Sequence, residues 1–235
     1  MEIEKLIIEK IKTSTTEHYP FPHFLIDNLL DRDFLSEVFN DLNLLEATKP
    51  TNIFKSEFGE KKEWKYFPEH LANLNQLLNV LSDNDFIESL KEKFNINKNI
   101  KIYPDLTYDG GGYVYSPPGS FLGYHADFNF SSKTNKYRVL NILLYMNDDY
   151  QDSQGGALHL LDAKSKTVEK IVSPIANRLL AFSTDDTSFH GVSLNHNSFF
   201  RRSFNLYFYS DTPISLNQSS EPHKTIWLNF ENHDH

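Results

Sequence analysis

The sequence contains no cysteine, which excludes a disulfide framework. It also has no basic excess, because 23 Lys and Arg stand against 32 Asp and Glu and give a net charge of -9. Phosphate binding relies on clustered cations, so this balance argues against a nucleic-acid-binding face. The basic clusters at Lys61-Lys62 and at 91–101 are interrupted by acids, and we interpret them as solvated helix faces.

No apolar run approaches the ~20 residues needed to span a bilayer, and the amphipathic, acidic residues 1–10 are unlike a secretory signal. We therefore expect a cytoplasmic protein without a nucleic-acid or membrane partner. An internal repeat and a Gly/Ser/Pro-rich linker are also lacking, while 39% hydrophobic residues are ample for a core. These features predict a single domain over residues 1–235, with helical support at 1–99, a core at 100–210 and a tail at 211–235.

Hydrophobic periodicity separates a helical first part from a strand-rich second part. Helical periodicity is found at 2–13, 31–43, 67–81 and 84–94, with Asp31 and either Ser82 or Asp83 as caps. Strand patterns are found at 100–106, 111–116, 121–128, 137–146, 157–161, 167–172, 177–183, 188–193 and 201–209. This order predicts an α+β chain, mainly β, whose jelly-roll core (a double-stranded β-helix) is backed by N-terminal helices.

Three further segments are expected to border the core. Trp227 and Phe230 lie among polar residues of the tail, which we expect to fold back over a rim. The polar segments 131–136 and 48–66 are candidates for mobile lids.

His125 and Asp127 are the first candidate site residues. With 10 His and 32 acidic residues in the chain, about one such pair is expected by chance, so the spacing alone is weak evidence. In a β-strand, however, residues i and i+2 point to the same face. The aromatic flanks of the pair, together with Gly119 and Gly123, favour a strand that leaves a turn. The pair can therefore hold one ion from one face of a strand.

His190 is the candidate for a third ligand, and His159 is its main rival. An isolated histidine in an apolar strand is more often a hydrogen-bonded core residue than a ligand. His190 differs because the strand pattern with two arginines at 201–209 comes after it. Two imidazoles and one carboxylate can occupy one face of an iron ion and leave the other positions open.

The pattern at 201–209 turns one arginine to each face of a half-buried strand. It predicts one face with Arg201, Ser203, Asn205 and Tyr207, and an opposite face with Arg202, Phe204, Leu206 and Phe208. A buried arginine is costly unless an anion satisfies its donors, and its planar fork suits a carboxylate. For an isolated arginine, a structural salt bridge is the simpler interpretation. A neighbouring pattern places Asn141, Leu143 and Tyr145 on one face, where Tyr145 can share a carboxylate with Arg201.

Taken in order, these segments resemble the prolyl-4-hydroxylase-type branch of the 2-oxoglutarate/Fe(II)-dependent dioxygenases. The resemblance covers about residues 100–210 and is carried by 115–119, 124–127, 138–147, 155–158, 177–182, 189–192 and 201–203. Residues 20–30 also resemble an amino-terminal segment common in bacterial members.

The resemblance implies the roles of individual residues. It makes His125, Asp127 and His190 the catalytic iron ligands, and Arg201 the partner of the distal carboxylate of 2-oxoglutarate. Arg202 takes that role if the strand register is off by one, because the spacing from His190 is slightly longer than is common in the branch.

Four more residues match positions around this site. Tyr145 matches a tyrosine that assists the arginine, Tyr115 matches one that lines the same pocket, and Leu158 matches an apolar wall residue. Arg138 matches a position that approaches the substrate in relatives, although a surface or salt-bridge role is equally consistent with its place in the sequence.

The resemblance also implies a reaction. It implies a non-haem Fe(II) dioxygenase that uses 2-oxoglutarate and O2, with ascorbate as a candidate reductant. A prolyl residue, an amino acid or another small-molecule or peptidyl substrate is hydroxylated with release of succinate and CO2, and fold-level analogy does not choose among these substrates. Halogenating members replace the carboxylate ligand with a small residue, so Asp127 implies hydroxylation. The alternative is a non-catalytic, metal-containing jelly-roll binding module, against which the complete triad with Arg201 argues.

Overall fold

The computed structural model describes residues 2–56, 59–196 and 198–228. In these residues, one sheet contains β1 (Thr16–Glu17), β2 (His23–Ile26), β3 (Asn52–Ser56), β4 (Gly59–Trp64), β5 (Ile102–Pro104), β6 (Gly112–Ser116), β8 (Phe130–Ser131), β9 (Lys136–Tyr145), β12 (Arg178–Ser183) and β14 (Arg201–Ser210). The other contains β7 (Leu122–Ala126), β10 (Leu158–Leu161), β11 (Val168–Val172), β13 (His190–Val192) and β15 (Ile226–Trp227).

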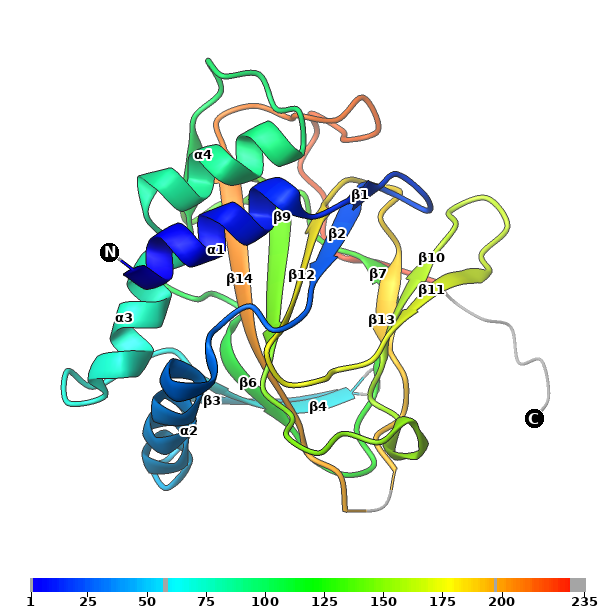
Figure 1. Ribbon diagram of the computed structural model, residues 1–235. Coiled ribbons are helices and arrows are strands. Elements are labelled where there is room, and N and C mark those ends of the chain that lie inside the picture. The colour runs from blue at the N-terminus through cyan, green and yellow to red at the C-terminus, as the bar shows by residue number, and fades with distance from the viewer. Residues whose placement is uncertain (1, 57–58, 197, 229–235) are drawn as a thin grey trace.

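Both sheets are antiparallel, and neither closes into a barrel. The larger sheet has the order β1-β2-β12-β9-β14-β6-β4-β3, with β5 on β14 and β8 on β9. The smaller has the order β11-β10-β13-β7-β15. Figure 1 shows the two sheets as neighbouring layers, with the long strands β9 and β14 in the middle of the molecule. The predicted fold, mainly β with helices and a jelly-roll core, is confirmed.

Helices lie on the side of the larger sheet that faces away from the smaller one (Figure 1). They are α1 (Glu2–Thr13), α2 (Arg32–Glu46), α3 (Ala72–Val80) and α4 (Asn84–Lys93), and a short 3-10 helix, η1 (Asp152–Gln154), comes after β9. In α1, Ile3, Ile7 and Ile11 are buried at a spacing of four residues, so one apolar stripe packs into the core. Among the described residues, no helix is long and apolar enough to cross a membrane.

The helix starts are explained by capping. The Asp31 carboxylate accepts a hydrogen bond from Phe34 N at 2.9 Å at the start of α2, and that of Asp83 accepts one from Phe86 N at 2.7 Å at the start of α4. Asp83 is therefore the cap, and Ser82 is not. The helix predicted from residue 67 begins only at Ala72, because the residues before it form a turn in which Leu71 N donates to the Pro68 carbonyl.

Alternation along β14 separates the helix-covered core from a pocket. Phe204, Leu206 and Phe208 belong to the core cluster that the helices share. Asn205 and Tyr207 point to the opposite side, where they line a pocket. The two faces predicted for this strand are thus confirmed.

The sequence pattern missed several strands in the first part of the chain. Segment 48–66, expected as a lid, contains the hairpin β3–β4, and β4 pairs with β6 so that the hairpin extends the larger sheet. Its alternation is hard to recognise because charged residues stand on both faces. The interpretation of Lys61-Lys62 as part of a helix face is therefore wrong. Segment 131–136, the other expected lid, contains the turn that joins β8 to β9, and these two strands pair with each other.

The tail folds back as predicted for Trp227. β15 pairs with β7, with Trp227 opposite His125, and the two rings lie 4.9 Å apart. Phe230 lies outside the described residues.

Candidate metal centre and its pocket

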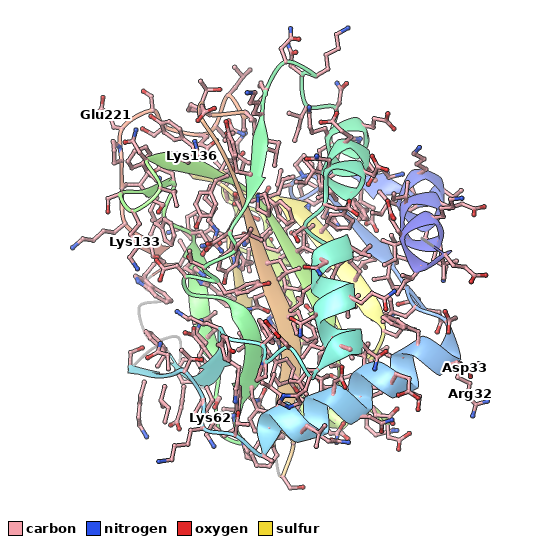
Figure 2. All side chains as sticks on the ribbon, turned by 90° about the vertical axis from the view of Figure 1, so that its left-hand side faces the viewer. Arg32, Asp33, Lys62, Lys133, Lys136 and Glu221 are labelled. Atoms are coloured by element: carbon pink, nitrogen blue, oxygen red, sulfur yellow. The ribbon has the colours of Figure 1, made fainter. Side chains whose placement is uncertain are left out.

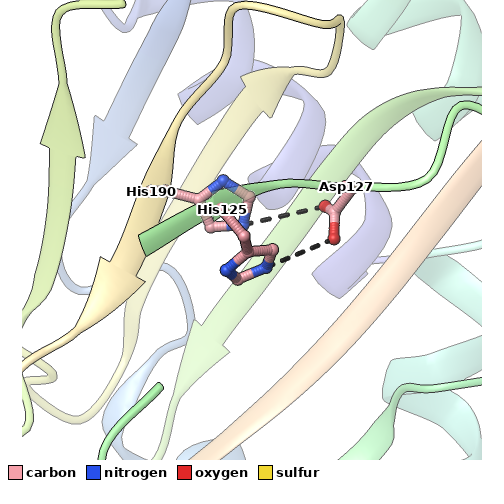
Figure 3. Close-up of side chains that lie close together, drawn as sticks. All are labelled: His125, Asp127 and His190. Carbon is pink, nitrogen blue, oxygen red and sulfur yellow. Dashed lines mark ion pairs between the residues drawn. The ribbon is translucent and has the colours of Figure 1, made fainter. Parts of the chain in front are cut away.

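His125, Asp127 and His190 point toward one another between the two sheets (Figure 3). His125 on β7 is the register partner of His190 on β13, and Asp127 is the first residue after the end of β7. His125 Nε2 lies 3.5 Å from Asp127 Oδ1, and His190 Nε2 lies 3.7 Å from Asp127 Oδ2. The candidate ligand atoms all lie within 4.8 Å of one another, so one ion can contact all three.

The backbone orients both imidazoles. Nδ1 of His125 lies 2.8 Å from the Gly123 carbonyl, and Nδ1 of His190 lies 2.9 Å from that of Ser188. A carbonyl only accepts, so each Nδ1 carries the proton and each Nε2 offers its lone pair to the centre. Burial, with a contribution from His125, lowers the pKa of His190 to about 4, which keeps this ring neutral as a metal ligand must be.

Asp127 is held ionised by its neighbours. Its Oδ2 accepts a hydrogen bond from Asn141 Nδ2 at 2.8 Å and lies 3.0 Å from Arg138 Nη2. Burial raises the pKa of Asp127, but the Arg138 guanidinium and the contact with His125 hold it well below its usual range. The carboxylate therefore remains an anionic ligand in a buried setting.

Arg138 adopts the salt-bridge role, one of the two that its sequence position allows. It is 3% exposed, its Nε donates to Asn141 Oδ1 at 2.9 Å, and its guanidinium carbon lies 3.5 Å from the centre of the Tyr207 ring. A direct contact with substrate remains a prediction. Alternation in β9 predicts the correct face for Asn141, but no sequence signal indicates its bond to Asp127.

Arg201 is a second polar group of the pocket, in addition to the candidate metal centre. It is 3% exposed, its Nε donates to the Gly156 carbonyl at 3.0 Å, and its Nη1 donates to Ser203 Oγ at 3.0 Å. Arg201 Nη2 and Tyr145 Oη are buried and have no hydrogen-bond partner among the described residues. The guanidinium carbon lies 5.1 Å from the Tyr145 ring centre, so the two groups are neighbours. Leaving buried donors unpaired is costly, and a carboxylate is the ligand that suits them.

Arg202 points to the other face of β14, where its Nη2 lies 3.1 Å from Glu46 Oε2. The geometry therefore favours Arg201 over Arg202 as the partner of a bound carboxylate. Leu158 lies in the pocket wall, as expected.

Tyr115 and His159, two further candidates from the sequence, do not line the pocket. Val114 and Ser116 are the wall residues of β6, and alternation turns Tyr115, which we expected in this wall, to the opposite face, where it packs against the helix-covered core. Its ring packs on Phe200 at 5.0 Å and lies 5.5 Å from the Arg202 guanidinium carbon. His159 is not in the cluster of ligand atoms, and its Nδ1 forms a hydrogen bond with Tyr124 Oη at 2.7 Å.

The pocket fits an Fe(II) ion and a 2-oxoglutarate molecule. Two imidazoles and one ionised carboxylate form a facial set for iron that leaves positions open. The unpaired Arg201 and Tyr145 groups fit the distal carboxylate of the co-substrate. The cavity of about 390 Å³ has its apolar wall at Leu143, Leu158 and Val192.

Residues 111–209 match the family model described as the 2OG-Fe(II) oxygenase superfamily. The fold is similar to a Pseudomonas putida prolyl-4-hydroxylase, with a TM-score of 0.56 and 17% identity over 88% of this chain and 97% of the other. It is also similar to a Trichoplax adhaerens prolyl hydroxylase in complex with a hypoxia-inducible factor oxygen degradation domain peptide fragment, with a TM-score of 0.59 and 18% identity over 89% of this chain and 90% of the other. No curated protein sequence matches the chain. At these identities, the solved structures establish a shared fold.

Proposed function

We propose that this chain, whose residues 111–209 match the model of the 2OG-Fe(II) oxygenase superfamily and whose fold is similar to that of prolyl-4-hydroxylases, is a 2-oxoglutarate/Fe(II)-dependent dioxygenase. In this proposal it hydroxylates a C–H bond of a small or peptidyl substrate. The observation that carries this proposal is the convergence of His125, Asp127 and His190 in one pocket with Arg201, whose Nη2 has no hydrogen-bond partner among the described residues.

When bound, Fe(II) with 2-oxoglutarate and O2 supplies the oxidation, in which decarboxylation of 2-oxoglutarate to succinate and CO2 accompanies insertion of oxygen into the substrate. His125, Asp127 and His190 hold the metal in this proposal. Arg138 and Asn141 keep the Asp127 carboxylate ionised and oriented. Positioning of this kind by neighbours of the ligands is a general determinant of metal affinity.

Arg201 orients the co-substrate. Two of its nitrogens are fixed by Gly156 and Ser203, so the guanidinium is preorganised and presents Nη2 to the distal carboxylate. Tyr145 adds a hydroxyl donor, and Leu158 is an apolar wall for the methylene groups. We keep ascorbate as a candidate reductant.

The substrate class includes a prolyl residue, a free amino acid and another small molecule. The peptide fragment in the Trichoplax adhaerens complex supports a peptidyl substrate as one option. Asp127 favours hydroxylation over halogenation, because a carboxylate in that position fills the site that a halide would need and repels a second anion.

The proposal is tested by release of succinate from 2-oxoglutarate with Fe(II), with and without candidate substrates from a metabolite and peptide panel. We expect release in the wild-type protein and none with His190→Ala. Metal and 2-oxoglutarate binding without any release would instead favour the non-catalytic binding module.

A further inference from the structure

Three charged residues of the hairpin β3–β4 form one wall of the pocket. Lys61, Glu63 and Lys65 alternate along β4 and the residue after it, so they share a face and all three line the pocket. Lys62 points to the other face, where its ammonium lies 5.9 Å from the Tyr115 ring centre. Figure 2 looks onto the side of the molecule that carries the helices, and Lys62 is labelled there on the hairpin.

Both carboxylate oxygens of Glu63 already have partners among its neighbours. The residue is 1% exposed, and its Oε1 lies 2.7 Å from Lys61 Nζ. Its Oε2 accepts a hydrogen bond from Asn52 Nδ2 at 2.9 Å and lies 3.3 Å from Lys65 Nζ. A cationic ligand would have to displace these partners, so Glu63 is poorly suited to recognise one.

The two lysines retain binding capacity. Each ammonium has three donors. Among the described residues, Lys61 Nζ donates to Glu63 and to the Gly110 carbonyl at 2.9 Å, which leaves one donor. Lys65 has only longer contacts, 3.3 Å to Glu63 and 3.9 Å to Asp109. Their side chains are 21% and 20% exposed, and both residues line the cavity.

The local charge balance is positive although the chain carries -9. Glu60 and Asp109 also line the pocket, and each is paired with a lysine outside its lining, Glu60 with Lys55 at 2.9 Å and Asp109 with Lys133 at 2.8 Å. With these two pairs neutral, Lys61 and Lys65 stand against Glu63 alone, and the formal charge that remains is +1. In a low-dielectric cleft such a surplus attracts an anion.

The two lysines and the metal centre line the same cavity. A molecule bound through an anionic group at Lys61 and Lys65 can therefore extend toward His125, Asp127 and His190 within it.

We propose that Lys61 and Lys65 bind an anionic group of the substrate, a carboxylate or a phosphate, while Glu63 holds the two ammonium groups in place. This inference rests on the proposed function, because it assigns the substrate class of the same pocket. It narrows the substrate class to acids, whereas the fold alone does not distinguish acids from other substrates.

The test uses protein loaded with Ni(II) and saturating 2-oxoglutarate, and ligand-observed NMR to measure affinity. The probes are the N-acetyl derivatives of the standard amino acids as free acids and as primary amides, with the amide of N-acetyl-phosphoserine as the phosphate arm. We expect the best binders to prefer the acid, or the phosphate, over the matched neutral amide by about tenfold or more.

The variants Lys61→Gln and Lys65→Gln should abolish this preference, whereas Lys62→Gln, on the opposite face, should leave it intact. Thermal unfolding and 2-oxoglutarate affinity, measured on every variant, separate loss of the subsite from loss of the fold.

A panel without any preference for an anionic probe would overturn the inference, and so would an equal effect of Lys62→Gln. If the wild-type protein fails to bind 2-oxoglutarate in the presence of Ni(II), the proposed function fails instead. The two outcomes are thus distinguishable.

Discussion

Replacing Arg201 by lysine separates charge from shape at the co-substrate site. The guanidinium uses Nε and Nη1 within the protein and presents Nη2 to the pocket, whereas lysine has one ammonium and no planar fork. Lysine cannot reach the Gly156 carbonyl, Ser203 and a ligand with the same geometry. We therefore expect 2-oxoglutarate to bind more weakly while the charge of the pocket is unchanged.

The magnitude is set by the bond that is lost. A hydrogen bond to a charged group contributes about 1.5–3 kcal/mol, and each 1.4 kcal/mol is a factor of ten in affinity, so the dissociation constant of 2-oxoglutarate should rise about ten- to a hundredfold. Calorimetry on the Ni(II)-loaded protein measures it directly and requires no substrate.

The neighbouring arginine is the matched control. Arg202 is bound to Glu46 on the opposite face of β14, so Arg202→Lys should leave 2-oxoglutarate affinity within about twofold of wild type. If Arg202→Lys weakens the binding and Arg201→Lys does not, the reasoning about the strand face is refuted.

Four further predictions concern the metal centre and the hairpin. His190→Ala should reduce metal affinity by orders of magnitude in calorimetry, while His159→Ala should not; full metal loading of the first variant would refute the ligand assignment. Arg138→Gln removes the ion pair between Arg138 and the carboxylate ligand Asp127, and it should weaken Ni(II) binding ~10 to 100-fold. An unchanged affinity for Ni(II) would show that metal binding by Asp127 does not depend on Arg138. With Asp127 in place, mass spectrometry of the product should show oxygen insertion and no chlorinated product in excess chloride. Burial raises the pKa of Glu63, but Lys61 and the other partners hold it below its ordinary value of 4.5, so its contribution to stability is present above that pH and is lost as the pH falls through the folded-state pKa. In urea denaturation between about pH 5 and about pH 3, Glu63→Gln should therefore lose less stability than wild type; equal losses would contradict this.

Much of the architecture could be predicted from local patterns. Helix α1 and the two faces of β14 are consequences of periodicities of 3.6 and 2, and the caps Asp31 and Asp83 reflect the need to satisfy free N–H groups. The strand with two arginines downstream of His190, together with the family resemblance, predicts that His190 joins His125, and the pairing of β7 with β13 brings the two together.

The features that the sequence does not predict depend on packing between distant segments. Tyr115 lies in a strand whose alternation can be recognised in the sequence, but only the assembled sheet determines which face of that strand meets the pocket. Asn141 and Arg138 act through Asp127, which lies outside their own strand. The assignment of Lys61 to a helix is wrong because charges on both faces of β4 hide a period of two. A spacing of i, i+2 and i+4 among Lys61, Glu63 and Lys65 is the available signal.

The most direct test of the central claim is the fate of the two atoms of O2. Wild-type protein with Fe(II), 2-oxoglutarate, 18O2 and a substrate found in the panel should form succinate that carries one 18O atom and a hydroxylated product that carries the other, as measured by mass spectrometry, and His190→Ala should form neither. Unlabelled succinate, or no succinate from a protein that binds both the metal and 2-oxoglutarate, would contradict the dioxygenase reaction proposed for this pocket.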